Sequence, residues 1–337
     1  MSTKPATIKE IAKRLNVSPS TVSRALHSHP SISTATTEKI KQTAKELKYE
    51  PNERAILFQK GKTYTIGVIL PELAEAFFST AVSTIEDLAY RKNYTILLAQ
   101  SHDDEEREKL LVQKMKNHRV DGLIISVGKT TTNFDHFNLL NHYNIPVVFF
   151  DRIPPLKDIH SVACNIETGS IAIVDYLLKR GHRTIGLING PHSLTASGQR
   201  KEGYIKALLK NRLKFDPSLI VNCDLSETGT KAALDQLLAN SRKPTAIVTF
   251  NDYVSAFAIK YAKTLDSLKD YKLDFVSYAN TPMINFMENK PLASIEQFPA
   301  TQAQRAMDVL FDILNTEHQE AQFYYKIVID AELVENN

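Results

Sequence analysis

The first 50 residues carry apolar side chains at helical spacing in three short segments. The first segment has one apolar face, made by Ile8, Ile11, Ala12 and Leu15. Thr7 can cap this helix, and after a tight turn Ser18 can cap a second helix with Pro19 at its first position. Ser33 or Thr34 opens a third segment, whose lysines face outward. Two short helices joined by a tight turn and supported by a third predict a helix-turn-helix.

From Thr65 onward the pattern changes to short apolar runs that alternate with amphipathic helices. The strand-like runs are residues 66–70, 94–99, 122–126, 147–151, 219–222, 246–250, 274–278, 293–297 and 324–329. Such alternation predicts parallel sheets covered by helices on both faces. The order that begins at Thr65-Ile66-Gly67 recurs from Thr184-Ile185-Gly186, so we expect two similar lobes with a cleft between them. The predicted fold class is therefore α/β, with an all-α headpiece.

These patterns divide the chain into a helical headpiece at residues 1–50, a linker at 51–62 and a two-lobed core at 63–337. The first lobe is expected from about residues 63–162 plus 293–323, and the second from about 163–292 plus 324–337. The linker holds too many large apolar residues to be a plain solvated tether, so part of it is expected to be covered.

Charge is unevenly distributed between these parts. Residues 1–60 hold 11 Lys and Arg against 5 Glu, a net charge of +6, while the rest of the chain carries −3. A positive end suits a polyanionic partner, although such a run can also be a solvated helix face. We find no signal peptide and no long apolar run, and two cysteines without metal-type spacing, which together predict a cytoplasmic protein with no membrane partner.

Taken in order, these segments resemble the LacI/GalR family of bacterial repressors. In the headpiece and linker the resemblance rests on TIKEIA at residues 7–12, VSPSTVSRAL at 17–26, and Tyr49, Pro51, Asn52 and Ala55. In the core it rests on VFFDR at 148–152, GHRTIG at 181–186, Arg200 with Gly203 and Tyr204, and Asn251 with Asp252. Any one of these matches is weak evidence, but together, in the order in which the family has them, they are highly specific for it.

The resemblance implies a transcription regulator, a repressor, with a periplasmic-binding-protein-like core. Its partners would be double-stranded DNA with a pseudo-palindromic operator, a second copy of the chain, and a small effector such as a sugar or sugar derivative. No cofactor is implied, and the protein would be associated with the nucleoid. No heptad segment follows the last predicted strand, so we expect a homodimer and no higher assembly. The residues leave open whether the effector releases DNA or promotes binding.

The second helix is expected to enter the major groove of the DNA. Arg24 is the best candidate base reader, because its planar guanidinium can bond both acceptors of a guanine edge. Pro19 and Ser20 stand at the exposed start of this helix, where family members vary their specificity. Contacts to the DNA, mostly to phosphates, are expected from Thr7, Ile8, Ser18, Thr21 and Ser23. The alternative for the hydroxyl residues is helix capping and solvation alone.

The linker departs from the family pattern, whose hinge helix usually places a leucine between base pairs. This chain reads Ala55-Ile56-Leu57-Phe58, and counting from Pro51 puts Phe58 in the position of that leucine. Leu57 is the alternative, and Phe58 could instead pack on the core. Asn52 is expected to contact DNA at the hinge entry.

For the effector, the resemblance implies that Arg200 and Asp252 of the second lobe hold polar groups of the ligand. Asp151 contributes from the first lobe, and Phe78 stacks on the apolar face of the ligand. Arginine and carboxylates suit hydroxyl groups, because they form charge-assisted hydrogen bonds with neighbouring oxygens. The alternative is a surface salt bridge between Arg200 and Asp252. Leu225 and Asn165 stand where the family often has an aromatic residue and an aspartate, which leaves room for a ligand other than a plain hexose.

Two other classes of protein fit parts of the pattern. A periplasmic sugar-binding protein would share the core but carry a signal peptide in place of the basic headpiece. An enzyme would need a catalytic set, and the sequence contains no dinucleotide-binding, phosphate-binding, zinc-protease or nucleophile-elbow motif. We therefore expect no catalytic residue and no metal site.

Overall fold

The computed structural model describes residues 6–49, 62–316 and 323–336. The chain forms two compact units that divide between Thr63 and Tyr64, and each is described by itself. Within the described residues no helix is long and apolar enough to cross a membrane.

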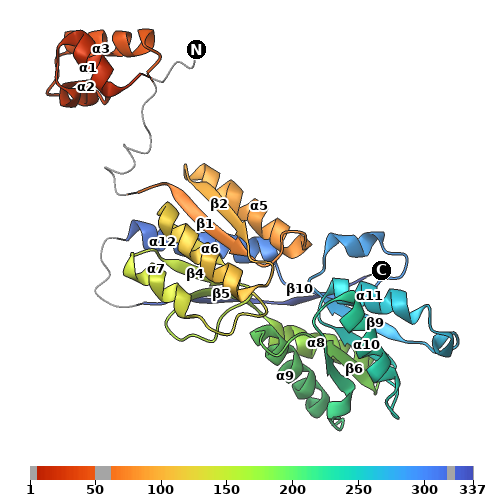
Figure 1. Ribbon diagram of the computed structural model, residues 1–337. Helices are drawn as coiled ribbons and strands as arrows, with labels where there is room; N and C mark the ends of the chain where they lie inside the picture. Colours follow the sequence, from red (N-terminus) through yellow and green to blue (C-terminus); the bar gives the residue numbers. More distant parts are fainter. Residues whose placement is uncertain (1–5, 50–61, 317–322, 337) are drawn as a thin grey trace. The chain divides into compact units, whose positions relative to one another are not determined.

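The headpiece consists of three helices: α1 (Ile8–Leu15), α2 (Pro19–Leu26) and α3 (Thr34–Glu46) (Figure 1). Thr7 and Glu10 form a capping box at the start of α1, and α1 ends at Asn16 in the left-handed conformation. Ser18 caps α2 through the N–H of Thr21, and Ser33 caps α3. The three helices enclose a small core made by Ile11, Ala12, Val22, Ala25, Ile40 and Ala44. The predicted helix-turn-helix is confirmed.

The first lobe of the core is a six-stranded parallel sheet in the order β11-β5-β4-β3-β1-β2. Its strands are β1 (Thr65–Leu70), β2 (Thr95–Gln100), β3 (Gly122–Ile125), β4 (Val147–Phe150), β5 (His160–Asn165) and β11 (Lys326–Asp330). Helices α5 (Ala76–Arg91) and α12 (Pro299–Asn315) cover one face, and α6 (Glu105–His118) and α7 (Asn138–His142) cover the other. Buried apolar residues of β1, β3 and β4 build a core on each side of the sheet, as a buried parallel sheet requires.

The second lobe is a six-stranded sheet in the order β12-β10-β9-β8-β6-β7, in which only β12 is antiparallel to its neighbour. Its strands are β6 (Ile185–Asn189), β7 (Ile220–Asn222), β8 (Ala246–Thr249), β9 (Asp274–Tyr278), β10 (Ala293–Glu296) and β12 (Glu332–Glu335). Helices α8 (Ile166–Lys179) and α9 (Thr195–Lys210) cover one face, and α10 (Glu227–Leu238) and α11 (Asp252–Ala262) the other. Short 3-10 turns lie at Asp135–Phe137, Pro217–Leu219, Asp266–Leu268 and Pro282–Phe286.

The chain passes between the lobes at three places: from β5 to α8, from β10 to α12, and from β11 to β12. This corrects the predicted lobe boundaries. Strand β10, expected in the first lobe, pairs with β9 and β12 of the second, and β11, expected in the second lobe, pairs with β5 of the first. Strand β5 itself was not predicted. These strands are four to six residues long, and their side chains carry no mark of which distant strand they will pair with.

Candidate functional site

The exposed start of α2 is lined by hydroxyl groups. The Ser18 hydroxyl lies 2.7 Å from that of Ser20 and 2.8 Å from that of Thr21, and accepts a hydrogen bond of 3.1 Å from the N–H of Thr21. Pro19 and Ser20 are exposed, while Thr21 and Ser23 are half-buried. The first turn of a helix also presents unbonded backbone N–H groups, so this surface has the donors that phosphate oxygens require.

Arg24 lies in the last turn of α2 and is exposed. Within the described residues its guanidinium makes no ion pair, in contrast to Arg14, whose guanidinium lies 3.4 Å from Glu46. A free planar cation on the exposed face of the second helix is the arrangement that base reading in the major groove needs.

The other DNA residues expected in the headpiece have structural partners of their own. The Thr7 hydroxyl and N–H both engage Glu10, and Ile8 packs on the headpiece core. Asn52, Leu57 and Phe58 lie outside the described residues.

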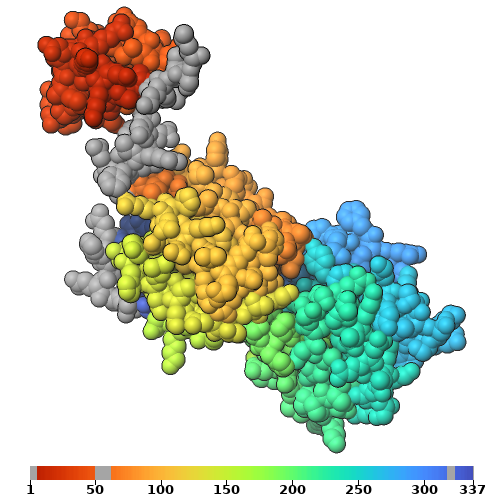
Figure 2. All heavy atoms as spheres, in the orientation of Figure 1, coloured from red at the N-terminus to blue at the C-terminus, as the bar shows by residue number. Residues whose placement is uncertain are grey.

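In the core, loops at the carboxyl ends of the strands of both lobes meet. Lys129, which follows β3, donates from its Nζ to the carbonyl of Asp224, which follows β7, over 3.2 Å. Tyr253, at the start of α11, has its hydroxyl 3.4 Å from both the Ala74 carbonyl and the Ala76 N–H, which follow β1. Figure 2 shows the surfaces of the two lobes in contact. The cleft thus lies where ligands bind in open α/β sheets.

Several loops at these strand ends hold non-glycine residues in the left-handed region. Asp103 after β2 has φ 59°, Asp151 after β4 has φ 59°, and Leu225 after β7 has φ 70°. Ala279 and Asn280 after β9 have φ 93° and 48°. This conformation is unfavourable for Leu225 and Ala279 in particular, and such strain is often found at functional sites.

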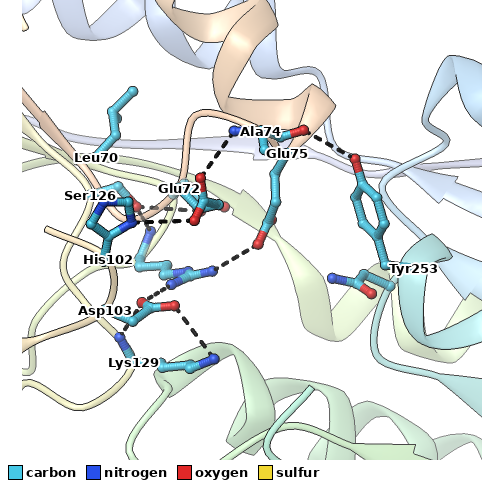
Figure 3. A network of polar contacts seen from close by, with 12 residues as sticks. Leu70, Glu72, Ala74, Glu75, His102, Asp103, Ser126, Lys129 and Tyr253 are labelled. Atoms are coloured by element: carbon cyan, nitrogen blue, oxygen red, sulfur yellow. Dashed lines mark hydrogen bonds and ion pairs between the residues drawn. The ribbon is translucent and has the colours of Figure 1, made fainter. Parts of the chain in front are cut away.

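A network of charged groups lies on the first-lobe side of the cleft (Figure 3). Arg152 Nη1 lies 2.7 Å from Asp103 Oδ1, and Arg152 Nη2 lies 4.0 Å from Glu75 Oε1. Lys129 Nζ lies 3.6 Å from Asp103 Oδ2. Asp103 is therefore the centre of the network, and it also accepts a hydrogen bond of 2.8 Å from the N–H of Lys129.

Asp151 is half-buried beside this network, and its carboxylate lies 3.5 Å from the Ser126 hydroxyl. Burial raises the pKa of Asp151 to about 6, against the opposing charges of Arg152 and Arg200. Arg200 belongs to α9 of the second lobe, and its charge partly opposes the rise in the pKa of Asp151, while the charge of Asp151 partly opposes the fall in the pKa of Arg200.

Arg200 is 3% exposed, and its guanidinium lies 3.9 Å from the ring centre of Phe250 and 4.4 Å from that of Tyr278. Nη1 donates to the Ala196 carbonyl over 3.3 Å, while Nε has no hydrogen-bond partner within the described residues. Burial lowers the pKa of Arg200 to about 10, so the group stays charged at neutral pH. Two aromatic rings thus fix a cation that retains an unused donor.

Two expected effector residues have surroundings that differ from the expectation. Asp252 is 0% exposed, and its carboxylate accepts hydrogen bonds from the hydroxyls of Ser277 and Ser294 and from the N–H of Thr281. It faces the interior of the second lobe and ties α11 to the ends of β9 and β10, because a buried carboxylate needs several donors. Phe78 is 1% exposed and belongs to the first-lobe core, under the guanidinium of Arg152.

Glu75, Asp103, Lys129 and Tyr253 were not identified from the sequence. Each lies within a few residues of the end of a predicted strand, so the same rule that marks Asp151 could have marked them. Between the lobes, next to Arg152, the structure has a cavity of only about 10 Å³, whereas a larger hollow of about 250 Å³ on the second lobe is lined by none of the expected effector residues. No group of three or more His, Cys, Asp or Glu in the described parts of the chain is placed to hold a metal ion.

Comparison with known proteins gives two family matches. Residues 63–329 match the periplasmic binding proteins and sugar binding domain of the LacI family, and residues 7–52 match the bacterial regulatory proteins of the lacI family. The headpiece match argues against the alternative of a periplasmic binding protein.

Curated relatives match over nearly the whole chain. Catabolite control protein A of Priestia megaterium is 30% identical, over 92% of this chain and 93% of that protein. The HTH-type transcriptional repressor PurR of Vibrio atlanticus is 26% identical, over 94% and 95%. The solved structure of the Lac repressor bound to ONPG in the repressed state is 25% identical, with a TM-score of 0.77 over 98% of this chain and 99% of that chain. The chain belongs to the LacI family of bacterial regulatory proteins, as a DNA-binding transcription regulator with a ligand-binding core and not an enzyme.

Proposed function

We propose that the chain is a homodimeric repressor whose affinity for its operator is controlled by a sugar or sugar derivative bound between the two lobes. The observation that carries this proposal is the buried guanidinium of Arg200 in the second lobe, whose Nε has no hydrogen-bond partner within the described residues. Asp151 directly follows β4 of the first lobe, so one polar ligand between the lobes can bond both groups. The family model that matches the core is described as a sugar binding domain, and a regulator of the same fold was solved as a cellobiose complex.

In this proposal the cleft residues have different roles. Asp151 accepts hydrogen bonds from ligand hydroxyls, and Arg200 donates to ligand oxygens through its free Nε. Phe78 contributes an apolar wall once the lobes part. Asp252 acts indirectly, because its carboxylate fixes the N–H of Thr281 at the end of β9.

On the DNA side, the α2 helices of two copies enter adjacent major grooves of a pseudo-palindromic operator. The Lac repressor has been solved as a dimer bound to its operator, which supports the same arrangement here. Arg24 reads a base, the hydroxyl residues at the start of α2 hold phosphates, and Phe58 or Leu57 enters the minor groove. The protein works on chromosomal DNA in the cytoplasm and is associated with the nucleoid.

The ligand acts through the relative orientation of the lobes. A ligand that contacts Asp151 and Arg200 together binds one orientation better than others, and this difference in affinity is what shifts the equilibrium. The first lobe continues into the linker at its first strand, so a change in its orientation within a dimer alters the spacing of the two headpieces.

The test measures operator binding and ligand binding on the same protein. An operator is first selected from random DNA, and its binding is followed by fluorescence anisotropy with and without sugars, sugar phosphates and nucleosides. Asp151→Asn and Arg200→Lys should each raise the ligand concentration needed for half the effect at least tenfold. Asp308→Asn, an exposed carboxylate 3.6 Å from Arg305 on α12, is the control and should behave as the parent. The proposal fails if ligands bind in the cleft without changing the affinity for the operator.

A further inference from the structure

Glu75 stands at the junction of the two lobes. It immediately precedes α5 of the first lobe, and its side chain is 29% exposed. The hydroxyl of Tyr253, from the second lobe, contacts the backbone on both sides of it, at the Ala76 N–H and at the Ala74 carbonyl; Figure 3 shows the contact with Ala74. Glu75 therefore lies at a point where the two lobes touch, beside the loops that border the cleft.

The carboxylate of Glu75 is poorly bonded for its position. Its contact with Arg152 Nη2 is long, at 4.0 Å, because the guanidinium lies closer to Asp103, at 2.7 Å. Within the described residues it accepts no hydrogen bond, and it does not cap α5. Glu72, in the same loop, is different: its carboxylate accepts a hydrogen bond of 3.2 Å from the Ala74 N–H and lies 3.4 Å from His102 Nδ1.

The electrostatic surroundings of Glu75 also disfavour its charged form unless hydrogen-bond donors approach the carboxylate. Burial raises the pKa of Glu75, and the nearby Asp103 and Asp151 add to the rise, while Arg152 and Lys129 oppose it. A carboxylate that has lost part of its water without gaining donors carries a desolvation cost that is not compensated. A ligand that supplies hydroxyl or N–H donors would recover that cost.

The two cations nearest to Glu75 offer little to an anionic ligand, because Arg152 and Lys129 are both held by Asp103. A phosphate next to Glu75 would meet a carboxylate whose neighbouring cations are already paired, and like charges at short range cost binding energy.

We propose that Glu75 is a specificity residue of the effector cleft, which accepts hydrogen bonds from hydroxyl or N–H groups of an uncharged ligand and disfavours phosphorylated forms of the same ligand. This rests on the proposed function and deepens it, because it names the charge class of the effector. The competing explanation is that Glu75 only interacts favourably with the N-terminus of α5, which would make it a stability residue.

The experiment compares matched pairs of neutral and phosphorylated compounds by isothermal titration calorimetry on the full chain. The probes are D-glucose and glucose 6-phosphate, D-ribose and ribose 5-phosphate, adenosine and adenosine monophosphate, and cytidine and cytidine monophosphate. For the pair that binds, the neutral member should bind at least about tenfold more tightly, which corresponds to about 1.4 kcal/mol. Glu75→Gln should reduce that preference about fivefold or more, and Glu75→Ala should weaken the neutral ligand about tenfold.

The matched control is Glu72→Gln, which removes the same charge from the same loop and should keep the preference of the parent. Thermal melting checks folding, and Glu75→Asp, which keeps the charge but shortens its reach, should weaken the neutral ligand while still disfavouring the phosphate. Equal effects of Glu75→Gln and Glu72→Gln, or tighter binding of the phosphorylated member by the parent, would overturn the proposal.

The outcome also separates this inference from the proposed function. If no compound of the panel binds the parent or changes its affinity for the operator, the proposed function fails and the inference fails with it. If a neutral compound binds and controls operator affinity but its preference over the phosphate is independent of residue 75, only the inference fails.

Discussion

Replacing Lys129 with methionine should loosen the contact between the two lobes without disturbing either core. The ammonium group of Lys129 donates to the carbonyl of Asp224 across the cleft at 3.2 Å and lies 3.6 Å from Asp103 within its own lobe. Methionine keeps much of the apolar stem but removes both interactions. The variant therefore changes the relative stability of the closed arrangement and little else.

The magnitude follows from the geometry and exposure of the contact. A hydrogen bond from a charged group is worth about 1.5–3 kcal/mol when well shielded, whereas exposed ion pairs contribute about 0–1 kcal/mol. The Lys129 side chain is 28% exposed, and only its bond to Asp224 crosses between the lobes. We therefore expect a loss of about 1–2 kcal/mol, which shifts the balance between open and closed arrangements about 5–30-fold.

The assay is energy transfer between dyes on cysteines introduced at Asn141 of the first lobe and Ser241 of the second, both exposed. The two native cysteines are buried and should label slowly. Lys129→Met should increase the share of low-transfer, open molecules. Lys231→Met is the control, because Lys231 pairs with Glu227 at 2.8 Å within α10 and does not touch the first lobe. Identical distributions for Lys129→Met, Lys231→Met and the parent would refute the reasoning.

Three further predictions test other parts of the molecule. Arg24→Ala should cost about 1–3 kcal/mol of operator affinity and relax selectivity at one base pair, measured by sequencing DNA bound from a random pool, while Arg14→Ala should leave selectivity at each position unchanged. Because the pKa of Asp151 is raised from its usual 3.8 to about 6 in the folded chain, stability is lost as the pH rises from about 4 to about 6 and stays lower above that; Asp151→Asn should therefore melt at a higher temperature than the parent at pH 7, and the gap should close as the pH falls to 4. Gly203→Ala should destabilise the chain by about 1–3 kcal/mol in urea unfolding, because a Cβ there would lie 2.4 Å from Ser170 Cβ and 2.5 Å from the carbonyl oxygen of Glu167. Gly198→Ala on the same helix is the control: a Cβ there would have no atom within 4 Å, so the variant should stabilise the chain by about 0.5–1 kcal/mol.

Local features of the chain were predictable because they depend on neighbours in the sequence. The Ser18 cap followed by Pro19 marks the start of α2, and the apolar runs mark the strands. Both signals are local, because a helix cap and the spacing of apolar residues each involve only a few neighbouring residues. The same reasoning singled out Arg24, which is exposed in the last turn of α2.

Features that depend on distant partners were not predictable. The surroundings of Asp252 are an example, because its carboxylate is bonded by hydroxyls 25 and 42 residues further along the chain, which no local pattern marks. Strands β10 and β11 were assigned to the wrong lobes. Their apolar residues, such as Ile295 and Ile327, suit the core of either lobe, and the sequence does not show which strand each will pair with. The role proposed for Glu75 depends on Arg152 lying closer to Asp103 than to Glu75. This difference arises only when the loops that carry the three residues have folded.

The construction of the lobe junction explains how a small ligand can control the orientation of the lobes. The three chain crossings lie together, because Asp330 pairs with Asn165 in one sheet and Glu332 pairs with Glu296 in the other, on either side of Ala331. Each lobe keeps its helices and sheet around its own apolar clusters, so rotation at this junction need not open either core. The bonds that cross the cleft, such as those of Lys129 and Tyr253, are polar and each worth about 1–2 kcal/mol. A ligand that makes a few charge-assisted bonds with both lobes supplies a difference in free energy of the same size, which is enough to decide the orientation.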